Sequence, residues 1–207
     1  ARRIIMEESS SEDEKVTHFQ GAAVESGHVA LQRRVWNLLA KGKVFSEMAT
    51  HPVVMDVMRR WLGTEFIMGS IAANRILPGG PGQEPHVDYP YWDFHAPETH
   101  PMGLNASYPV NAQVTIVLDP FTEVSGATAY LPGSQKHLRY PNEAEQKSFY
   151  DNCSRMIAAP GDTVIFFGAA WHSAKPPKAD HDRNAVLNNN LPKWVKTLED
   201  MPSSMPH

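Results

Sequence analysis

From residue 65 onward the chain is a succession of short β-forming runs separated by glycine- and proline-rich turns, and this pattern constrains the fold most. The run at 110–120 alternates Val110, Ala112, Val114 and Ile116 with polar residues, as expected for a strand with one buried face. Comparable runs, each bounded by turn residues, lie at 65–78, 126–132, 162–168 and 184–192. Many short strands of this kind predict an antiparallel sandwich or barrel.

Two amphipathic helices are expected before the first of these strands. Residues 27–41 carry apolar side chains at roughly helical spacing. Residues 50–63 repeat the pattern, with Pro52 suited to a first turn and Gly63 to a helix end. A short helix or loop is expected at 142–153. The fold class is therefore mainly β with supporting α-helices.

At 207 residues the chain fits one domain. We expect helical support at 1–63, a β core at 64–192 and a C-terminal tail at 193–207. Apolar residues make up 42% of the chain and charged residues 20%, which is globular composition.

Net charge, the length of the apolar runs and the cysteine count argue against nucleic-acid binding, a membrane span and a cysteine-based metal site. A net charge of −4 argues against a general nucleic-acid binder. No apolar run approaches the roughly 18–20 residues of a membrane span. Cys153 is the single cysteine, so neither an internal disulfide nor a cysteine-based zinc site can form. The segment "ARRII" also lacks a signal-peptide core, which favours a cytoplasmic protein. We expect a monomer or homodimer without a nucleic acid or membrane partner.

His86-Val87-Asp88 is the sharpest local feature. On an extended segment, residues i and i+2 point to the same side, so an imidazole and a carboxylate converge while Val87 faces away. A third ligand must come from elsewhere, and His172 is the best candidate because "DTVIFFGAAWHS" delivers it at the end of an apolar strand. Two histidines and one carboxylate on one face are the arrangement of non-haem Fe(II) oxygenases.

Other histidines leave alternatives open. Asp93-x-His95 is a competing pair in the same loop, and His100 is close by. Each of these side chains is equally compatible with a solvated loop. The remaining histidines are interpreted as surface or capping groups: His18, His28, His51, His137, His181 and His207.

Arg183 follows His172 by eleven positions, at the start of the next predicted strand. A hairpin-like return of the chain would bring its guanidinium back toward the metal pocket, where its planar fork matches a carboxylate. The alternative is a surface arginine that pairs with Asp180 or Asp182.

Aromatic residues follow the His-x-Asp motif directly, where a loop would line the entrance of a substrate site. Alternation places Tyr89 and Tyr91 on one side and Trp92 on the other. We predict these three as substrate-binding residues, of which one or two contact the substrate while the rest pack against the barrel.

Several motifs between residues 74 and 191 occur in one order: Gln83-x-x-His86-x-Asp88, "LDPFTEVSGATAYLPGSQKH", Gly161-Asp162, the "WH" at 171–172, and Arg183. In this order they resemble the phytanoyl-CoA dioxygenase-like family of Fe(II)- and 2-oxoglutarate-dependent oxygenases. Gln135 stands where the family usually has the histidine of "PGSH", a position that is not a metal ligand.

The resemblance implies a double-stranded β-helix, or jelly roll, with iron held by His86, Asp88 and His172. It also implies that Arg183 binds the 5-carboxylate of 2-oxoglutarate. Asn74 and Thr115 lie near family positions that contact this cosubstrate, although both are equally compatible with ordinary polar strand residues.

The implied activity uses Fe(II), 2-oxoglutarate and O2 to hydroxylate a C–H bond of a small organic substrate, with release of succinate and CO2. Desaturation, cyclisation, epimerisation and halogenation are alternative outcomes of the same chemistry. Halogenation is disfavoured because Asp88 occupies the position where halogenating relatives commonly have a small residue. A non-catalytic metal-binding jelly-roll protein is the remaining alternative.

Overall fold

The computed structural model describes residues 1–9, 31–80, 82–88 and 108–202. Its larger sheet has five antiparallel strands in the order β1-β2-β8-β3-β6. Their bounds in that order are Gln32–Val35, Ile67–Ile76, Arg183–Leu191, Ala112–Val117 and Thr163–Phe167. Strands that are neighbours in the sheet are distant in the sequence, which is typical of a closed double-sheet fold.

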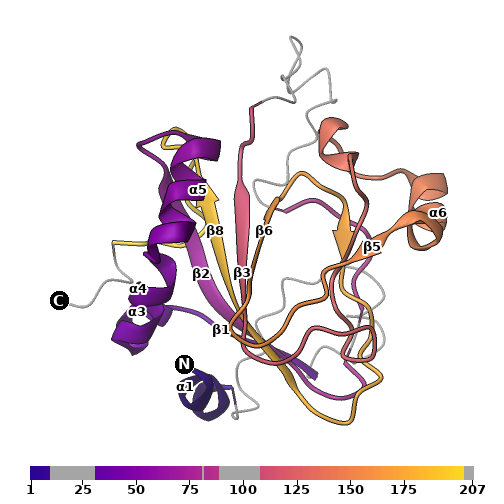
Figure 1. Ribbon diagram of the computed structural model, residues 1–207, viewed down its shortest axis with the longest axis horizontal. Coiled ribbons are helices and arrows are strands. Elements are labelled where there is room, and N and C mark those ends of the chain that lie inside the picture. The colour runs from indigo at the N-terminus through magenta and orange to yellow at the C-terminus, as the bar shows by residue number, and fades with distance from the viewer. Residues whose placement is uncertain (10–30, 81, 89–107, 203–207) are drawn as a thin grey trace.

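The smaller sheet has three strands in the order β5-β4-β7. Their bounds are Ser154–Arg155, Ala129–Tyr130 and His172–Ser173. Residues 82–88 run along β7, since His86 and His172 exchange two backbone hydrogen bonds, each 3.0 Å long. The two sheets face each other and form the jelly roll, as predicted (Figure 1).

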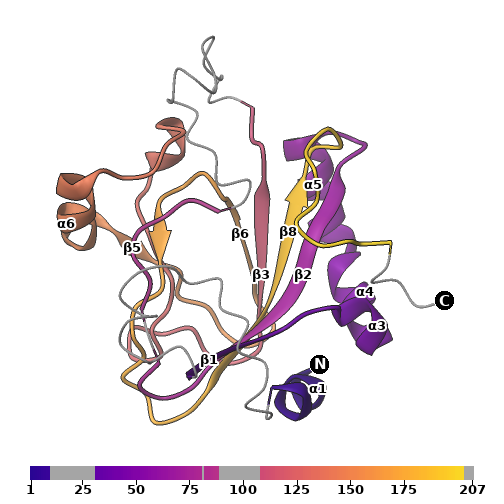
Figure 2. The same cartoon turned by 180° about the vertical axis from the view of Figure 1, so that it is seen from behind.

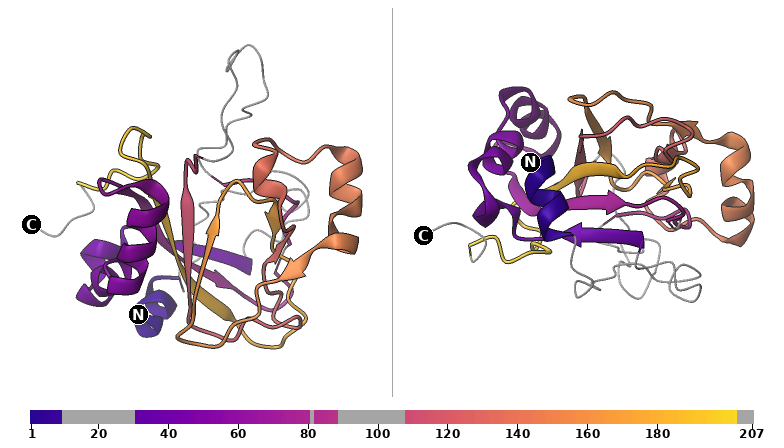
Figure 3. Two further views of the ribbon diagram at one scale, coloured as in Figure 1. Left: turned by 45° about the horizontal axis from the view of Figure 1, so that its top comes forward. Right: turned by 90° about the horizontal axis from the view of Figure 1, so that it is seen from below.

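Helices cover the outer side of each sheet. Four of them pack on or beside the larger sheet: α1 (Arg2–Glu8), α3 (Leu38–Lys41), α4 (Lys43–Ala49) and α5 (Pro52–Leu62). The short helix η2 (Ser134–Lys136) precedes α6 (Glu143–Asn152), which covers the smaller sheet. Viewed from behind, the same layers follow in reverse order (Figure 2), and α5 and α6 stay on opposite sides of the strands in a tilted view (Figure 3).

The larger sheet has an outer and an inner face. Ile71, Val114 and Val186 belong to the core that packs under the helices. Their neighbours in the strands point the opposite way, and among them Val117 and Leu187 join a second core with residues that lead into the smaller sheet. The inner face therefore looks toward the smaller sheet and the outer face toward the helices.

The predicted helix over 27–41 is wrong over residues 32–35, and only its last residues, Leu38–Lys41, are helical, as α3. Residues 32–35 form strand β1, which pairs with the edge of β2. Asn37 then adopts a left-handed backbone conformation (φ 57°) before α3 begins. Tertiary pairing with an open sheet edge outweighs a local helical spacing of this length.

The second predicted helix is confirmed as α5, with Pro52 in its first turn and Gly63 at its end. None of the helices in the described ranges is both long and apolar enough to cross a bilayer.

Candidate metal centre

The His-x-Asp motif lies on the extended segment that accompanies β7. His86 is held by the bridge to His172, and the backbone N–H of Asp88 donates to the carbonyl of Gly168 at 2.8 Å. Val87 points to the other side and is buried beneath α6 with Trp171. Alternation along the segment therefore places both metal-capable side chains on the inner side, as the sequence pattern predicted.

His172 reaches the same place from β7 and not from the end of β6. Strand β6 ends at Phe167, and a turn closed by the 2.9 Å bond from Ala170 N–H to the Phe167 carbonyl carries the chain into the smaller sheet. The apolar run from 163 to 167 belongs to the larger sheet. The expected delivery of His172 by that strand is therefore wrong, although the histidine arrives beside the motif.

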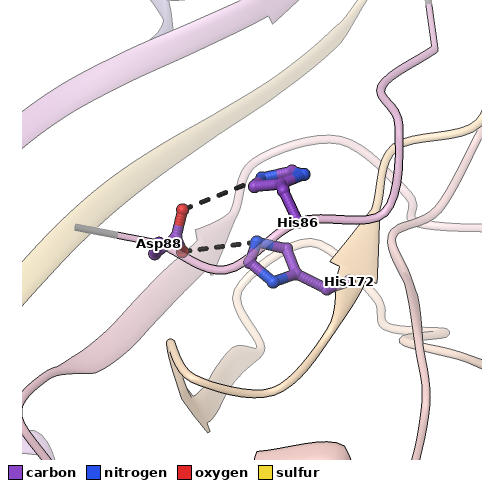
Figure 4. A group of neighbouring side chains, drawn as sticks. All are labelled: His86, Asp88 and His172. Carbon is purple, nitrogen blue, oxygen red and sulfur yellow. Dashed lines mark ion pairs between the residues drawn. The ribbon is translucent and has the colours of Figure 1, made fainter. Parts of the chain in front are cut away.

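His86, Asp88 and His172 converge (Figure 4). Each offers one ligand atom, and these atoms lie within 4.8 Å of one another. The Asp88 carboxylate faces both imidazoles, with Oδ1 at 3.9 Å from His86 Nε2 and Oδ2 at 3.3 Å from His172 Nε2. Among the residues that the structure describes, this is the one group of three such side chains with metal-ligand spacing.

Backbone carbonyls orient both imidazoles. His86 Nδ1 lies 2.7 Å from the Glu84 carbonyl oxygen, and His172 Nδ1 lies 2.9 Å from that of Ala170. A carbonyl oxygen only accepts, so each Nδ1 donates a proton. Nε2 is then the nitrogen with which each ring can bind a metal, as is usual for metal-bound histidine.

Proximity sets the charges of the three groups. Burial and the neighbouring His172 lower the pKa of His86 to about 4. Burial opposes ionisation of Asp88, but His172 and then His86 outweigh it and lower the pKa of Asp88 to about 2. Burial lowers the pKa of His172, but the Asp88 charge and hydrogen bond raise it by more. At neutral pH the Asp88 carboxylate thus faces a neutral His86, and it favours the protonated form of His172. Metal binding requires the deprotonated imidazole and would therefore release any proton held by His172.

Arg183 opens β8 and is buried, with 5% of its surface exposed. Its guanidinium donates to the Gly126 carbonyl and lies 4.7 Å from the Phe121 ring. Burial lowers its pKa to about 10. No carboxylate forms an ion pair with Arg183 within the described ranges, so this cation lacks a counter-charge.

The two aspartates proposed as alternative partners of Arg183 are engaged elsewhere. Asp182 pairs with Arg75 at 2.6 Å, and Asp180 lies 3.2 Å from His181. Arg183 is therefore not a surface arginine.

Gly126 supports Arg183 at a position that only glycine fits. Its φ is +73°, and a Cβ atom there would overlap the Lys175 carbonyl oxygen. We expect Gly126→Ala to lower the free energy of unfolding by about 2–4 kcal/mol, since backbone strain and overlap add. Gly133→Ala is the matched control, because its φ of +86° is similar but no atom lies within 4 Å of the added carbon. Urea unfolding of both variants measures the difference, and equal losses would show that the Lys175 contact costs nothing.

The two predicted cosubstrate contacts lie on the inner face. Asn74 on β2 accepts a 2.9 Å hydrogen bond from Gln32 Nε2. Thr115 on β3 is buried and lies opposite Leu187. Their contact with a cosubstrate stays a prediction.

The predicted substrate residues Tyr89, Tyr91 and Trp92 lie outside the described residues, as do the competing ligands Asp93, His95 and His100.

One charged residue near the site was missed by the sequence analysis. Arg34 on β1 lies opposite Asn74 and is close enough for its positive charge to lower the pKa of both His86 and Asp88. The alternation of Gln32 and Arg34 in "QRRV" would have indicated it, had these residues been recognised as an edge strand.

A jelly roll that gathers two imidazoles and one carboxylate between its sheets offers the donor set of facial-triad metal sites. Comparison with known families agrees: the model of the phytanoyl-CoA dioxygenase (PhyH) family matches residues 1–185. The chain belongs to this family, and the match extends well beyond the motifs that first indicated it.

Curated relatives include fungal dioxygenases. The dioxygenase trt7 of Aspergillus terreus is 26% identical over 164 residues, which cover 75% of this chain and 53% of trt7. The dioxygenase lolE1 of Epichloe uncinata is 32% identical over 142 residues, covering 64% of this chain and 49% of lolE1. The chain thus spans about half the length of the curated relatives it matches.

Solved structures share the fold. HygX from Streptomyces hygroscopicus, with nickel, 2-oxoglutarate and hygromycin B bound, aligns with a TM-score of 0.65 and 15% identity over 89% of this chain and 84% of HygX. The α-ketoglutarate-dependent epimerase SnoN from nogalamycin biosynthesis aligns with a TM-score of 0.59 and 13% identity, over 78% of this chain and 62% of SnoN.

Proposed function

We propose that this protein is an Fe(II)- and 2-oxoglutarate-dependent dioxygenase that hydroxylates a C–H bond of a small organic molecule. The observation that carries the proposal is the convergence of His86, Asp88 and His172, whose ligand atoms lie within 4.8 Å of one another. Membership of the phytanoyl-CoA dioxygenase family supports it.

The donor set fits ferrous iron. Two imidazole nitrogens and one carboxylate oxygen are the ligands of non-haem Fe(II) oxygenases, and they leave other coordination positions open. The carbonyls of Glu84 and Ala170 fix the rings with Nε2 available, which supports binding without rearrangement. The Asp88 charge compensates part of the charge of the cation.

The uncompensated guanidinium of Arg183 supports a dicarboxylate cosubstrate. A buried cation is costly unless an anion pairs with it. The far carboxylate of 2-oxoglutarate would supply that anion, and the guanidinium fork matches its two oxygens. Asn74, Thr115 and the positively charged Arg34 lie on the same inner face, and we assign them to the cosubstrate region.

Within this scheme the side chains bind and orient, and they perform no acid–base step. Bound iron would supply the oxidation, in which O2 and 2-oxoglutarate yield succinate and CO2 and one oxygen atom enters the substrate. Arg183 anchors the cosubstrate at one end. Phe166 contacts the His172 ring edge to face, with centroids 5.1 Å apart, and packs against that side of the cluster.

The placement of the substrate decides the reaction outcome. A hydroxylation adds one oxygen atom to the product mass, whereas a desaturation removes two hydrogens. Mass spectrometry of the product separates the proposed hydroxylation from these alternatives.

The proposal is tested by adding Fe(II) and then 2-oxoglutarate to the metal-free protein without oxygen. A keto acid chelated to Fe(II) gives a weak visible charge-transfer band. We expect this band to appear and to saturate at about one equivalent of each ligand, as a single site requires. Iron binding without the band would contradict the cosubstrate assignment and favour a metal-binding jelly-roll protein.

A further inference from the structure

Three polar, uncharged side chains cross the inner face of the larger sheet in one row. Asn189 on β8 lies opposite Ser70 on β2 and opposite Gln113 on β3. Gln113 in turn lies opposite Phe166 on β6, whose ring contacts His172. Ser70, Asn189 and Gln113 are called the polar row below.

Asn189 carries an unsatisfied amide. The residue is 4% exposed, and neither Oδ1 nor Nδ2 has a hydrogen-bond partner within the described part of the chain. Leaving a buried polar group unpaired costs about 1–3 kcal/mol. Native folds rarely carry such a group without a reason.

The sheet makes room for this amide. A register shift between Met68 and Ser70 places Gly69 beside Asn189. A Cβ atom at Gly69 would lie 2.5 Å from Asn189 Oδ1, so the glycine is needed where the amide sits.

The polar row is separate from the cosubstrate anchor. Asn189 lies six residues after Arg183 on the same strand, which is about 20 Å at the rise of a β-strand. Phe166 lies two strands from Asn189, which is about 10 Å. The row therefore lies away from the cosubstrate anchor and approaches the metal cluster through Phe166. A small organic molecule is long enough to span from Asn189 to the metal.

We propose that the polar row binds the substrate, and that Asn189 selects an uncharged molecule with an amide- or lactam-type pair of hydrogen-bond donor and acceptor. The inference rests on the proposed function and names the substrate class of the same site. The Asn189 amide offers both an acceptor and donors, which match such a pair in two hydrogen bonds. None of the three row residues is charged, so a carboxylate or ammonium group buried there would lack a counter-charge.

Asn188 supplies a matched control. It has the same side chain, is 1% exposed and is equally unpaired, but it points to the outer face beside Ile71 and Val114. Replacement of either asparagine by leucine removes an unpaired buried amide at similar volume. Both Asn188→Leu and Asn189→Leu should therefore retain the stability of the wild type. Asn189→Ala serves as a second variant if leucine is too large.

The test is a ligand-observed NMR screen of neutral lactams, each paired with the amino acid formed by opening its ring. Wild type, Asn188→Leu and Asn189→Leu are screened with and without Zn(II) and 2-oxoglutarate. We expect lactams to bind the wild type and Asn188→Leu, and to bind Asn189→Leu at least about tenfold more weakly, as loss of a buried hydrogen-bond pair predicts. The ring-opened amino acids should not show this difference.

The proposal is overturned if no lactam distinguishes Asn189→Leu from Asn188→Leu, or if the charged amino acids show the same loss. Its failure is distinguishable from failure of the proposed function. The Fe(II)–2-oxoglutarate band should be equal in the wild type and both variants, because neither asparagine belongs to the metal cluster or the cosubstrate anchor. A missing band in the wild type contradicts the oxygenase function, whatever the screen shows.

Discussion

His172→Ala is expected to abolish stoichiometric Fe(II) binding and with it all turnover of 2-oxoglutarate. The substitution removes one of three ligands and leaves His86 and Asp88, too few for a stable facial site. Loss of a hydrogen-bond partner behind a ligand already costs 10- to 100-fold in metal affinity, so loss of the ligand itself should exceed about 100-fold. Anaerobic titration with Fe(II), followed by metal analysis of the desalted protein, measures the effect.

His181→Ala is the control for this experiment, since His181 is exposed and contacts Asp180 outside the cluster. It should bind iron as the wild type does. The thermal unfolding of both variants must stay cooperative, so that a folded protein without metal is distinguished from an unfolded one. If folded His172→Ala keeps full iron affinity, His172 is not a ligand and the centre must be assigned to other residues.

Arg183→Leu is expected to leave iron bound but to raise the dissociation constant of 2-oxoglutarate by about 100-fold. Removal of one partner of a buried charge pair costs about 2–5 kcal/mol, and 1.4 kcal/mol corresponds to a factor of ten. Titration of the charge-transfer band with 2-oxoglutarate measures this change. Without cosubstrate the variant should be at least as stable as the wild type, because the guanidinium has no ion-pair partner in the described residues.

Arg75→Leu is the matched control, for which we expect a loss of stability without a loss of 2-oxoglutarate affinity. Arg75 is also a largely buried arginine of the larger sheet, but it pairs with Asp182 at 2.6 Å and faces away from the inner face. Its loss should lower stability by leaving Asp182 unpaired, while the affinity for 2-oxoglutarate stays the same. An Arg183→Leu variant that binds 2-oxoglutarate normally would overturn the anchor assignment.

Arg75 and Arg183 are both largely buried, but within the described residues only Arg75 has a carboxylate partner. In the sequence only Arg183 stands close to acidic residues, and a surface pair with Asp180 or Asp182 was a reasonable interpretation of it. In the fold, Arg75 takes Asp182 and Arg183 is left with a carbonyl and an aromatic ring. Only the strand register decides which of them keeps an uncompensated charge.

Local pattern was sufficient for much of the fold and for the motif of the candidate centre. Short β-forming runs bounded by turn residues predicted β2, β4, β6 and β8. Alternation of polar and apolar residues predicted β3, because one-sided burial leaves a period of two in the sequence. The same period predicted that His86 and Asp88 share a side and that Val87 faces away. The order of the motifs indicated the family, and the family match confirmed it.

Tertiary structure alone decided the rest. Strand β1 forms because the edge of β2 offers unpaired backbone groups, a cause that no local window contains. His172 lies on β7 because the chain crosses between sheets after Phe167. Asn188 and Asn189 are identical and adjacent in the sequence, yet one faces the helices and the other faces the metal cluster side. Local periodicity specifies which residues share a face, whereas long-range pairing determines what that face meets.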